Sequence, residues 1–252
     1  MDPTKKFNGY AEDYTAGRPG YASALIDWFY SDCGLSRDSV IADIGSGTGK
    51  FAVSFLKRGN EVYCVEPNDD MRAEAERELN GFLNFHSVRG GAEDTTLPSC
   101  FADLITTAQA FHWFDADKFR SECKRIIKDG GKVALIRNVR DRSDGINRDL
   151  YEVFSGYCPD FRGFSGGIKK DDPRIREFFR GRYDHLSFAN PLYYDKQKFI
   201  ARCLSGSYSI KEGETGYDRY MEELVGVFDR YSENGIVTIA NDSVAYIGSV
   251  GQ

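Results

Sequence analysis

Apolar and polar positions along the chain follow two alternating repeats. Short apolar runs rich in β-branched residues, typical of buried strands, occur at 39–44, 61–66, 83–88, 102–107 and 132–139. Between these runs, apolar residues recur every three or four positions, as they do in helices that bury one face. Strands and helices that alternate at this spacing predict right-handed βαβ crossovers and a parallel sheet.

Helix boundaries can be placed from capping residues. We expect Thr48 to cap the helix after the first strand, Asn68 the next helix and Asp115 the helix before the fifth strand. Outside this region the pattern is looser. It predicts helices near 8–16, 21–33, 195–205 and 214–232, one strand in "DHLSFANPLYY" and a last strand in "IVTIANDSVAYIG".

Composition changes this picture only by exclusion. The chain has 252 residues, of which 41% are hydrophobic, so it can bury a sizeable core. The formal charge of −6 argues against binding to nucleic acid backbones. The six cysteines are scattered, without CxxC pairs or histidines at metal spacing, so we expect reduced thiols and no metal site. No apolar leader or membrane span is apparent, and we expect a soluble, cytoplasmic protein.

The most informative stretch is "VIADIGSGTGKF", where a buried strand runs into three alternating glycines. Such a turn lets the backbone approach a ligand at the carboxyl edge of the sheet. It is not a P-loop, because Phe51 replaces the hydroxyl after Lys50. It also departs from the dinucleotide pattern G-x-G-x-x-G, because Lys50 takes the place of the last glycine. A tight turn without any ligand remains the alternative.

A second feature favours a ligand at this turn. Glu66 ends the second strand, directly before Pro67 and Asn68. A carboxylate at this position faces the glycine turn from the neighbouring strand and can accept both hydroxyls of a ribose. The alternative is a solvated acid at the end of a strand.

Five blocks together resemble a known family. They are "IADIGSGTGKF", "VYCVEPNDDM", "GGAEDTTLP", "ADLITTAQAFHWFD" and "IIKDGGKVAL". In order and spacing they are similar to the class I S-adenosylmethionine-dependent methyltransferases, closest to the small-molecule branch called type 11, related to ubiquinone-biosynthesis and trans-aconitate methyltransferases. The resemblance is strong over about 36–140. It is specific for the cofactor, S-adenosylmethionine, and poorly specific for the substrate.

The resemblance implies roles for several residues of these blocks. The glycines and Ser46 would shape the cradle for the methionine part, Asp43 would help to hold its amino group, and Glu66 would bind the ribose. The adenine would lie near Pro67, Met71, Ala92 and Glu93, although Gly91 stands where many relatives have an aspartate. Gln109 would border the sulfonium. Together with Tyr14 and Arg18 of the N-terminal segment considered below, the predicted cofactor-binding residues are Tyr14, Arg18, Asp43, Gly45, Ser46, Gly47, Gly49, Glu66, Pro67, Met71, Ala92, Glu93 and Gln109.

Two further predictions concern the edges of the site. His112 is the one histidine with a catalytic context, within "AQAFHWFD", and a structural imidazole among aromatic rings is its alternative role. Near the N-terminus, Tyr14 could cover the cofactor while Arg18 pairs with its carboxylate, with Pro19 and Gly20 as a hinge. The alternative is an amphipathic helix docked by its aromatic residues.

The expected architecture is a single Rossmann-like, doubly wound α/β domain. We expect a mostly parallel seven-stranded sheet with helices on both faces and an antiparallel last strand, as the resemblance implies. The domain would consist of an N-terminal helical lid (1–34), a cofactor-binding core (35–140), a helical insert over the acceptor pocket (141–182) and C-terminal strands and helices that complete the sheet (183–252).

The function indicated is methyl transfer from S-adenosylmethionine to a small molecule, by in-line displacement that depends on positioning. Two alternatives stay open: an oxidoreductase that binds NAD in the same cradle, and a catalytically silent S-adenosylmethionine-binding protein. A nucleic-acid methyltransferase is disfavoured, because no "NPPY"-like motif follows the fourth strand. Neither the acceptor nor the oligomeric state can be read from the sequence.

Overall fold

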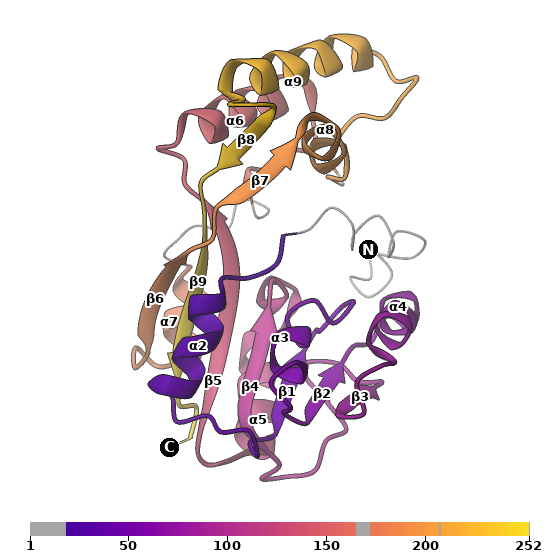
Figure 1. Cartoon of the computed structure of the whole chain (residues 1–252). Coiled ribbons are helices and arrows are strands. Elements are labelled where there is room, and N and C mark those ends of the chain that lie inside the picture. Colours follow the sequence, from indigo (N-terminus) through magenta and orange to yellow (C-terminus); the bar gives the residue numbers. More distant parts are fainter. Residues whose placement is uncertain (1–18, 165–171, 207, 252) are drawn as a thin grey trace.

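One large sheet organises the molecule. The structure is a computed structural model that describes residues 19–164, 172–206 and 208–251. Figure 1 shows the sheet, whose strand order is β3-β2-β1-β4-β5-β9-β6. Its strands are β1 (Ile41–Ile44), β2 (Val62–Val65), β3 (Phe85–Val88), β4 (Ala102–Ala108), β5 (Ile127–Arg140), β6 (Asp184–Ala189) and β9 (Asn241–Gly248). Strands β1 to β5 pair in parallel, and β9 is antiparallel to both β5 and β6. The predicted fold class is confirmed.

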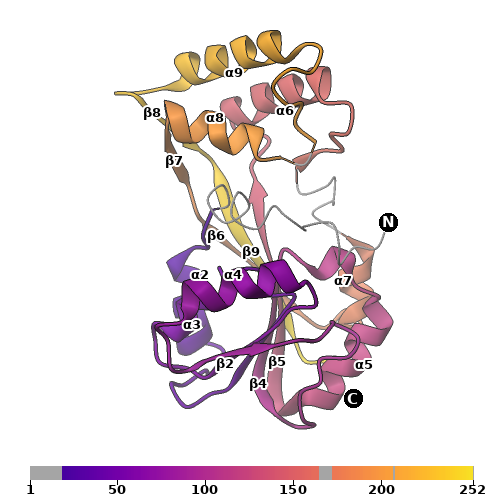
Figure 2. The ribbon, with the colours of Figure 1, turned by 90° about the vertical axis from the view of Figure 1, so that its right-hand side faces the viewer.

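Helices cover both faces of the sheet (Figure 2). On one face lie α2 (Ser23–Ser31), α3 (Val53–Leu56) and α4 (Asp69–Leu79), and on the other α5 (Ala116–Ile126) and α7 (Pro173–Phe178). Side chains of β5 alternate between two apolar clusters: Val133 and Leu135 pack with α5 and α7, whereas Ala134 and Ile136 pack with α2 and α3. This alternation is what a strand buried on both faces requires.

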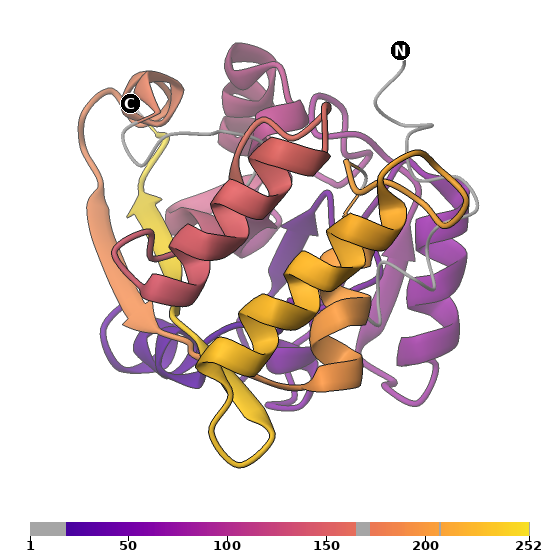
Figure 3. The ribbon, with the colours of Figure 1, turned by 90° about the horizontal axis from the view of Figure 1, so that it is seen from above.

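A second layer, here called the cap, stands beyond the carboxyl ends of the parallel strands (Figures 1 and 3). It comprises three helices and a two-stranded antiparallel ribbon: α6 (Gly145–Tyr157), β7 (Leu192–Asp195), α8 (Lys196–Leu204), α9 (Tyr217–Tyr231) and β8 (Ile236–Ile239). Leu150, Phe199 and Leu224 are fully buried in its own apolar cluster. The segment 141–182 is thereby divided, since α6 belongs to the cap and α7 packs beside α5.

Two strand predictions were wrong in extent. Each of the runs 184–194 and 236–248 was expected to form one strand, but each divides between the large sheet and the cap ribbon. Pro191 explains the first break, because it has no N–H to continue a ladder. At the same crossing, Asn190 donates its backbone N–H to the Asn241 carbonyl at 2.7 Å, and the Asn241 side chain donates its Nδ2 to the Asn190 carbonyl at 3.1 Å.

Capping residues were predicted correctly at two of three helices. The side chain of Asn68 accepts from the Met71 N–H at 2.9 Å, and that of Asp115 accepts from the Lys118 N–H at 3.2 Å. Thr48 was wrongly assigned as a cap, because the helix after the glycine turn begins only at Val53 and has no side-chain cap. The three glycines of the turn have positive φ angles, which a right-handed helix does not allow, so no helix can begin before the last of them.

Three further observations concern the cysteines, the lengths of the helices and the arrangement of potential metal ligands. All six cysteines are free thiols, as predicted, and four of them are buried: Cys64, Cys123, Cys158 and Cys203. Across the residues that the structure describes, no helix is long and apolar enough to cross a membrane, and no group of three or more potential ligands is arranged for a metal ion.

Candidate cofactor and acceptor site

The glycine turn after β1 is built from three glycines with different surroundings. Gly45, Gly47 and Gly49 have φ angles of 66°, 56° and 76°, which favour glycine. A Cβ on Gly45 would lie 2.8 Å from the Ala110 Cβ and 2.9 Å from the Phe114 ring, and one on Gly49 would meet Leu79 at 2.4 Å. A Cβ on Gly47 would meet no atom of the described part of the chain within 4 Å. Gly45 and Gly49 are therefore required by packing, whereas Gly47 leaves the backbone open to a ligand.

Glu66 connects this turn to the next strand. It follows β2, is only 8% exposed, and accepts from the Gly47 N–H with Oε2 and from the Asn68 N–H with Oε1, both at 2.9 Å. Burial raises the pKa of this carboxyl, while the two N–H groups and Arg72 act in the opposite direction. Each carboxylate oxygen keeps a second lone pair, so Glu66 can hold the turn and still accept a ligand hydroxyl.

Asp43 lies buried beneath the turn, within β1. Its side chain is 1% exposed, and Oδ1 accepts from the Thr106 hydroxyl on β4 at 2.7 Å. Its Oδ2 is buried and has no hydrogen-bond partner among the described residues. Burial raises the pKa of Asp43 to about 7, and the neighbouring Glu66 adds to the increase while the Thr106 bond opposes it. A buried acceptor left without a donor is suited to a cationic or N–H group of a ligand.

We expect this buried carboxyl to make the unliganded protein less stable as the pH rises. An ordinary aspartate titrates near 3.9, whereas Asp43 titrates near 7, so between these values the folded state binds more protons than the unfolded state. The free energy of unfolding should then fall by about 2–3 kcal/mol between pH 5 and pH 8 through this group. Urea denaturation of wild type and Asp43→Asn at several pH values measures the difference. Identical pH profiles would contradict the assignment.

The predicted adenine side lies along α4 and the loop after β3. Met71 and Ala92 are 3% and 5% exposed, and Pro67 is half-buried at the start of the α4 turn. Glu93 is exposed, and its Oε1 accepts from the Asp115 N–H at 2.9 Å. A Cβ on Gly91 would lie 3.7 Å from Oε2 of Glu93. This places the Glu93 carboxylate beside Gly91.

The aromatic segment after β4 closes the other side of the turn. Gln109 has a φ angle of 58°, donates its backbone N–H to the Ile136 carbonyl at 2.9 Å and its Nε2 to the Asn138 carbonyl at 3.3 Å. Such a positive φ costs a non-glycine residue roughly 1–2 kcal/mol, so tertiary contacts must hold it. His112, in the short 3₁₀ helix Phe111–Trp113, is half-buried with its ring centroid 4.6 Å from that of Trp113.

The structure brings most of the predicted site residues to one edge of the sheet. Asp43, the glycine turn, Glu66 and Gln109 come from β1, β2 and β4, which are neighbours where the strand order reverses. Tyr14 and Arg18 lie outside the described residues. Sequence reasoning missed Thr106, the partner of Asp43, and also Arg137 and Asp172 near His112. The sequence did offer signals for two of them: the adjacent hydroxyls of Thr106 and Thr107 interrupt the apolar strand β4, and Arg137 is a charged residue within the apolar strand β5.

Comparison with known proteins agrees with this geometry. Residues 42–135 match a family model described as a methyltransferase domain. An uncharacterized methyltransferase of Mycobacterium tuberculosis (strain ATCC 25618 / H37Rv) is 30% identical over 210 residues, covering 83% of this chain and 79% of the relative. An uncharacterized methyltransferase-like protein of Schizosaccharomyces pombe is 31% identical over 211 residues, covering 83% and 81%.

A solved structure shows the same fold. A protein from Anaeromyxobacter dehalogenans, described as a type II methyltransferase, superposes with a TM-score of 0.62 at 19% identity. The match covers 93% of this chain and 98% of that chain. Since the match extends over nearly the whole length of both chains, the shared fold includes the cap as well as the large sheet.

Proposed function

Because the chain belongs to the class I S-adenosylmethionine-dependent methyltransferases, we propose that this enzyme transfers the methyl group to a small-molecule acceptor held between the large sheet and the cap. The observation that carries the proposal is the hydrogen bond from Gly47 to Glu66. It places a buried carboxylate against Gly47, the glycine of this turn at which an added Cβ would meet no atom of the described residues within 4 Å. This arrangement fits a ribose beside the turn, with the methionine portion over Gly45 and Gly47.

The other residues of the edge fit the same ligand. Oδ2 of Asp43, which has no hydrogen-bond partner within the described ranges, would accept from the ligand's amino group, and Glu66 would accept from the ribose hydroxyls. When bound, S-adenosylmethionine supplies a sulfonium-activated methyl group, and the displaced electron pair stays on its sulfur. Pro67, Met71 and Ala92 would line the adenine, while Ser46 and Gly49 shape the turn.

Positioning would supply most of the rate enhancement. Aligned, in-line approach of an acceptor atom gains several kcal/mol without proton transfer. The aromatic segment Phe111–Phe114 would exclude water from the sulfonium. The half-buried His112 would accept the proton of an acceptor that releases one during methyl transfer.

We therefore expect a small effect from removing His112. His112→Ala should lower kcat by less than about tenfold, because positioning is proposed to supply most of the rate enhancement. A general base that is essential to the reaction would contribute more, typically 10²–10⁴-fold. Steady-state kinetics with the acceptor identified below, compared between wild type and the variant across pH 6–9, measures this. A loss of 10²-fold or more that is largest at high pH, where an imidazole base is unprotonated, and that shrinks toward low pH would make His112 the base.

The experiment that tests the function uses S-adenosylmethionine labelled in its methyl group. Purified wild-type protein should transfer the label to one or a few small molecules of a metabolite extract, separated by chromatography. Glu66→Ala should abolish these products at micromolar donor. Binding of the donor without any labelled product, in extracts from several sources, would favour the silent binding protein instead.

A further inference from the structure

A buried carboxylate outside the proposed binding edge holds the loop that follows β3. Glu122, on α5, is 7% exposed, and its Oε1 accepts from the backbone N–H and the hydroxyl of Thr95 at 2.8 and 2.5 Å. Arg125 donates Nε to Oε2 of Glu122 at 2.8 Å and Nη2 to Oε1 at 2.6 Å. Burial disfavours the charged form of Glu122, but the bonds from Arg125 and Thr95 outweigh it and lower its pKa to about 2. The carboxylate is therefore ionised at neutral pH and joins the loop to α5.

The loop that Glu122 holds is tightly folded and strained. It occupies 89–97, between β3 and β4, and a Cβ on Gly90 would lie only 2.8 Å from the Thr95 carbonyl oxygen. Thr96 has a φ angle of 62°, which costs a non-glycine residue about 1–2 kcal/mol and persists only where surrounding contacts enforce it. The bonds from Thr95 to Glu122 lie directly beside this strained residue, so they are suited to enforce its conformation.

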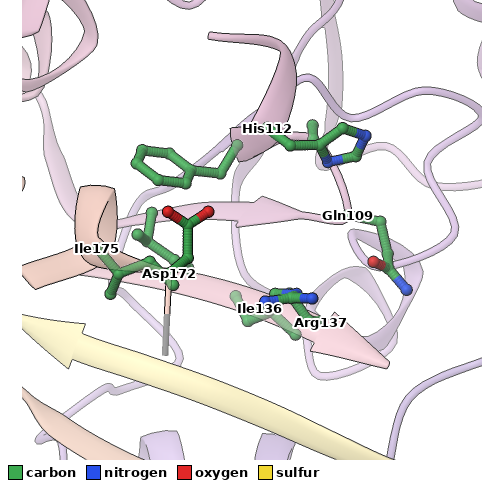
Figure 4. A pocket seen from close by; sticks show the side chains of 9 residues that line it. Gln109, His112, Ile136, Arg137, Asp172 and Ile175 are labelled. Atoms are coloured by element: carbon green, nitrogen blue, oxygen red, sulfur yellow. The ribbon is translucent and has the colours of Figure 1, made fainter. Parts of the chain in front are cut away.

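A second bond fixes the loop to the start of the same helix. Oε1 of Glu93 accepts from the N–H of Asp115, the N-cap residue of α5, at 2.9 Å. Asp115 and Glu122 are about two helical turns apart, so the loop is attached to α5 at two separate points. The attachment at Asp115 lies just beyond the aromatic segment after β4, whose His112 lines the small pocket in Figure 4.

The place of this loop along the sheet edge fits the base of the donor. The proposed methionine site lies at β1 and β4, and the proposed ribose site lies at Glu66 after β2. The base should therefore extend toward β3, which follows β2 in the strand order. The Glu66 N–H donates to the carbonyl of Val88, the last residue of β3, at 3.1 Å, so the loop begins directly beside Glu66. Ala92, which was assigned to the adenine, belongs to this loop and is 5% exposed.

From these contacts we infer that Glu122 is a positioning residue for the proposed cofactor site: through Thr95 it fixes the loop that distinguishes adenine from other bases. The inference rests on the proposed function, because it takes the ligand to be S-adenosylmethionine. Adenine presents an acceptor at N1 beside its amino group, whereas hypoxanthine presents an N–H donor at N1 beside a carbonyl oxygen. A loop held in one conformation matches one of these edges, while a loop that relaxes can adapt to both.

The test compares S-adenosylhomocysteine with S-inosylhomocysteine, in which hypoxanthine replaces adenine. In calorimetric titrations of the full-length wild-type protein, the adenosyl ligand should bind at least about tenfold more tightly, because the mismatched base leaves a donor or acceptor without its partner. In Glu122→Ala the ratio of the two affinities should fall to about threefold or less, with most of the loss on the adenosyl ligand. An unchanged ratio in folded Glu122→Ala would overturn the inference, since a purely structural role weakens both ligands alike.

Two substitutions at Thr95 test the same contact more gently. Thr95→Val removes the hydroxyl bond to Glu122 and keeps the backbone N–H bond, so its affinity ratio should lie between those of wild type and Glu122→Ala. Thr95→Ser keeps both bonds and should match wild type. If Glu122→Ala does not fold, Thr95→Val decides the question, and a wild-type ratio in that variant would contradict the inference.

Glu74→Ala is the matched control. Glu74 is also 7% exposed and pairs with an arginine three residues further on, Arg77, at 2.7 Å, but this pair lies within α4. Its removal should lower the melting temperature and leave the affinity ratio at the wild-type value. An equal fall of the ratio in Glu74→Ala would show a general loosening of the protein and would count against a specific role of Glu122.

Failure of the proposed function would give a different result. Wild-type protein that binds neither ligand would contradict both the cofactor site and the inference about Glu122. Wild-type protein that binds the two ligands equally would leave the cofactor site intact and overturn only the inference that this loop selects adenine.

Discussion

Glu66→Ala is expected to weaken S-adenosylmethionine binding by roughly 10²–10⁴-fold. The proposed contacts are two hydrogen bonds from ribose hydroxyls to a charged carboxylate, each worth about 1.5–3 kcal/mol. S-Adenosylhomocysteine has the same ribose, so it should lose affinity to a similar extent. Isothermal titration calorimetry with both ligands measures the effect.

The structure adds a condition to this experiment. Glu66 also accepts from the N–H groups of Gly47 and Asn68, so its removal leaves two donors of the turn without their partner. Glu66→Gln keeps one acceptor oxygen and should lie between wild type and Glu66→Ala in affinity. Asp69→Ala, an exposed acid three residues along the chain, is the matched control and should bind normally. Unchanged affinity of a folded Glu66→Ala protein would show that the carboxylate only supports the turn.

Gly47→Ala should separate ligand binding from folding. The added Cβ would meet no atom of residues 19–164, 172–206 and 208–251, so the fold should be destabilised only by the strain of a positive φ, about 1–2 kcal/mol. The methyl group would occupy the space where the ligand is proposed to lie against the backbone. Affinity for S-adenosylmethionine should therefore fall tenfold or more, about 1.4 kcal/mol at the least.

Gly45→Ala is the comparison for this variant. Its Cβ would collide with Ala110 and Phe114, so the melting temperature should fall much further than in Gly47→Ala. Thermal unfolding with and without ligand distinguishes the two positions. If Gly47→Ala retains full affinity, the open side of the turn faces solvent and the cofactor lies elsewhere.

The parts of the fold that the sequence predicted are those fixed by local patterns. Strands β1 to β5 and the caps at Asn68 and Asp115 follow from apolar runs and from residues that bond to their own helix. The division of 184–194 and 236–248 depends on where two distant segments cross, at Asn190 and Asn241. Only Pro191 carried a local signal of that break.

The site shows the same limit. Asp43, Gly47 and Glu66 could be selected because each stands at the end of a strand or in its turn. The bond from Gly47 to Glu66 joins residues 19 positions apart, and the bond from Thr106 to Asp43 joins residues 63 apart. Arg137 was overlooked because the strand around it looked structural, and its meeting with Asp172 depends on how α7 packs beside α5.

The central claim is that the edge formed by the glycine turn and Glu66 binds S-adenosylmethionine. The most direct test is calorimetric titration of the purified wild-type chain with S-adenosylmethionine and, separately, with NAD at the same concentrations. The account predicts one-to-one binding of S-adenosylmethionine, with a heat signal lost in Glu66→Ala, and no saturable binding of NAD. Saturable binding of NAD in place of S-adenosylmethionine would contradict it.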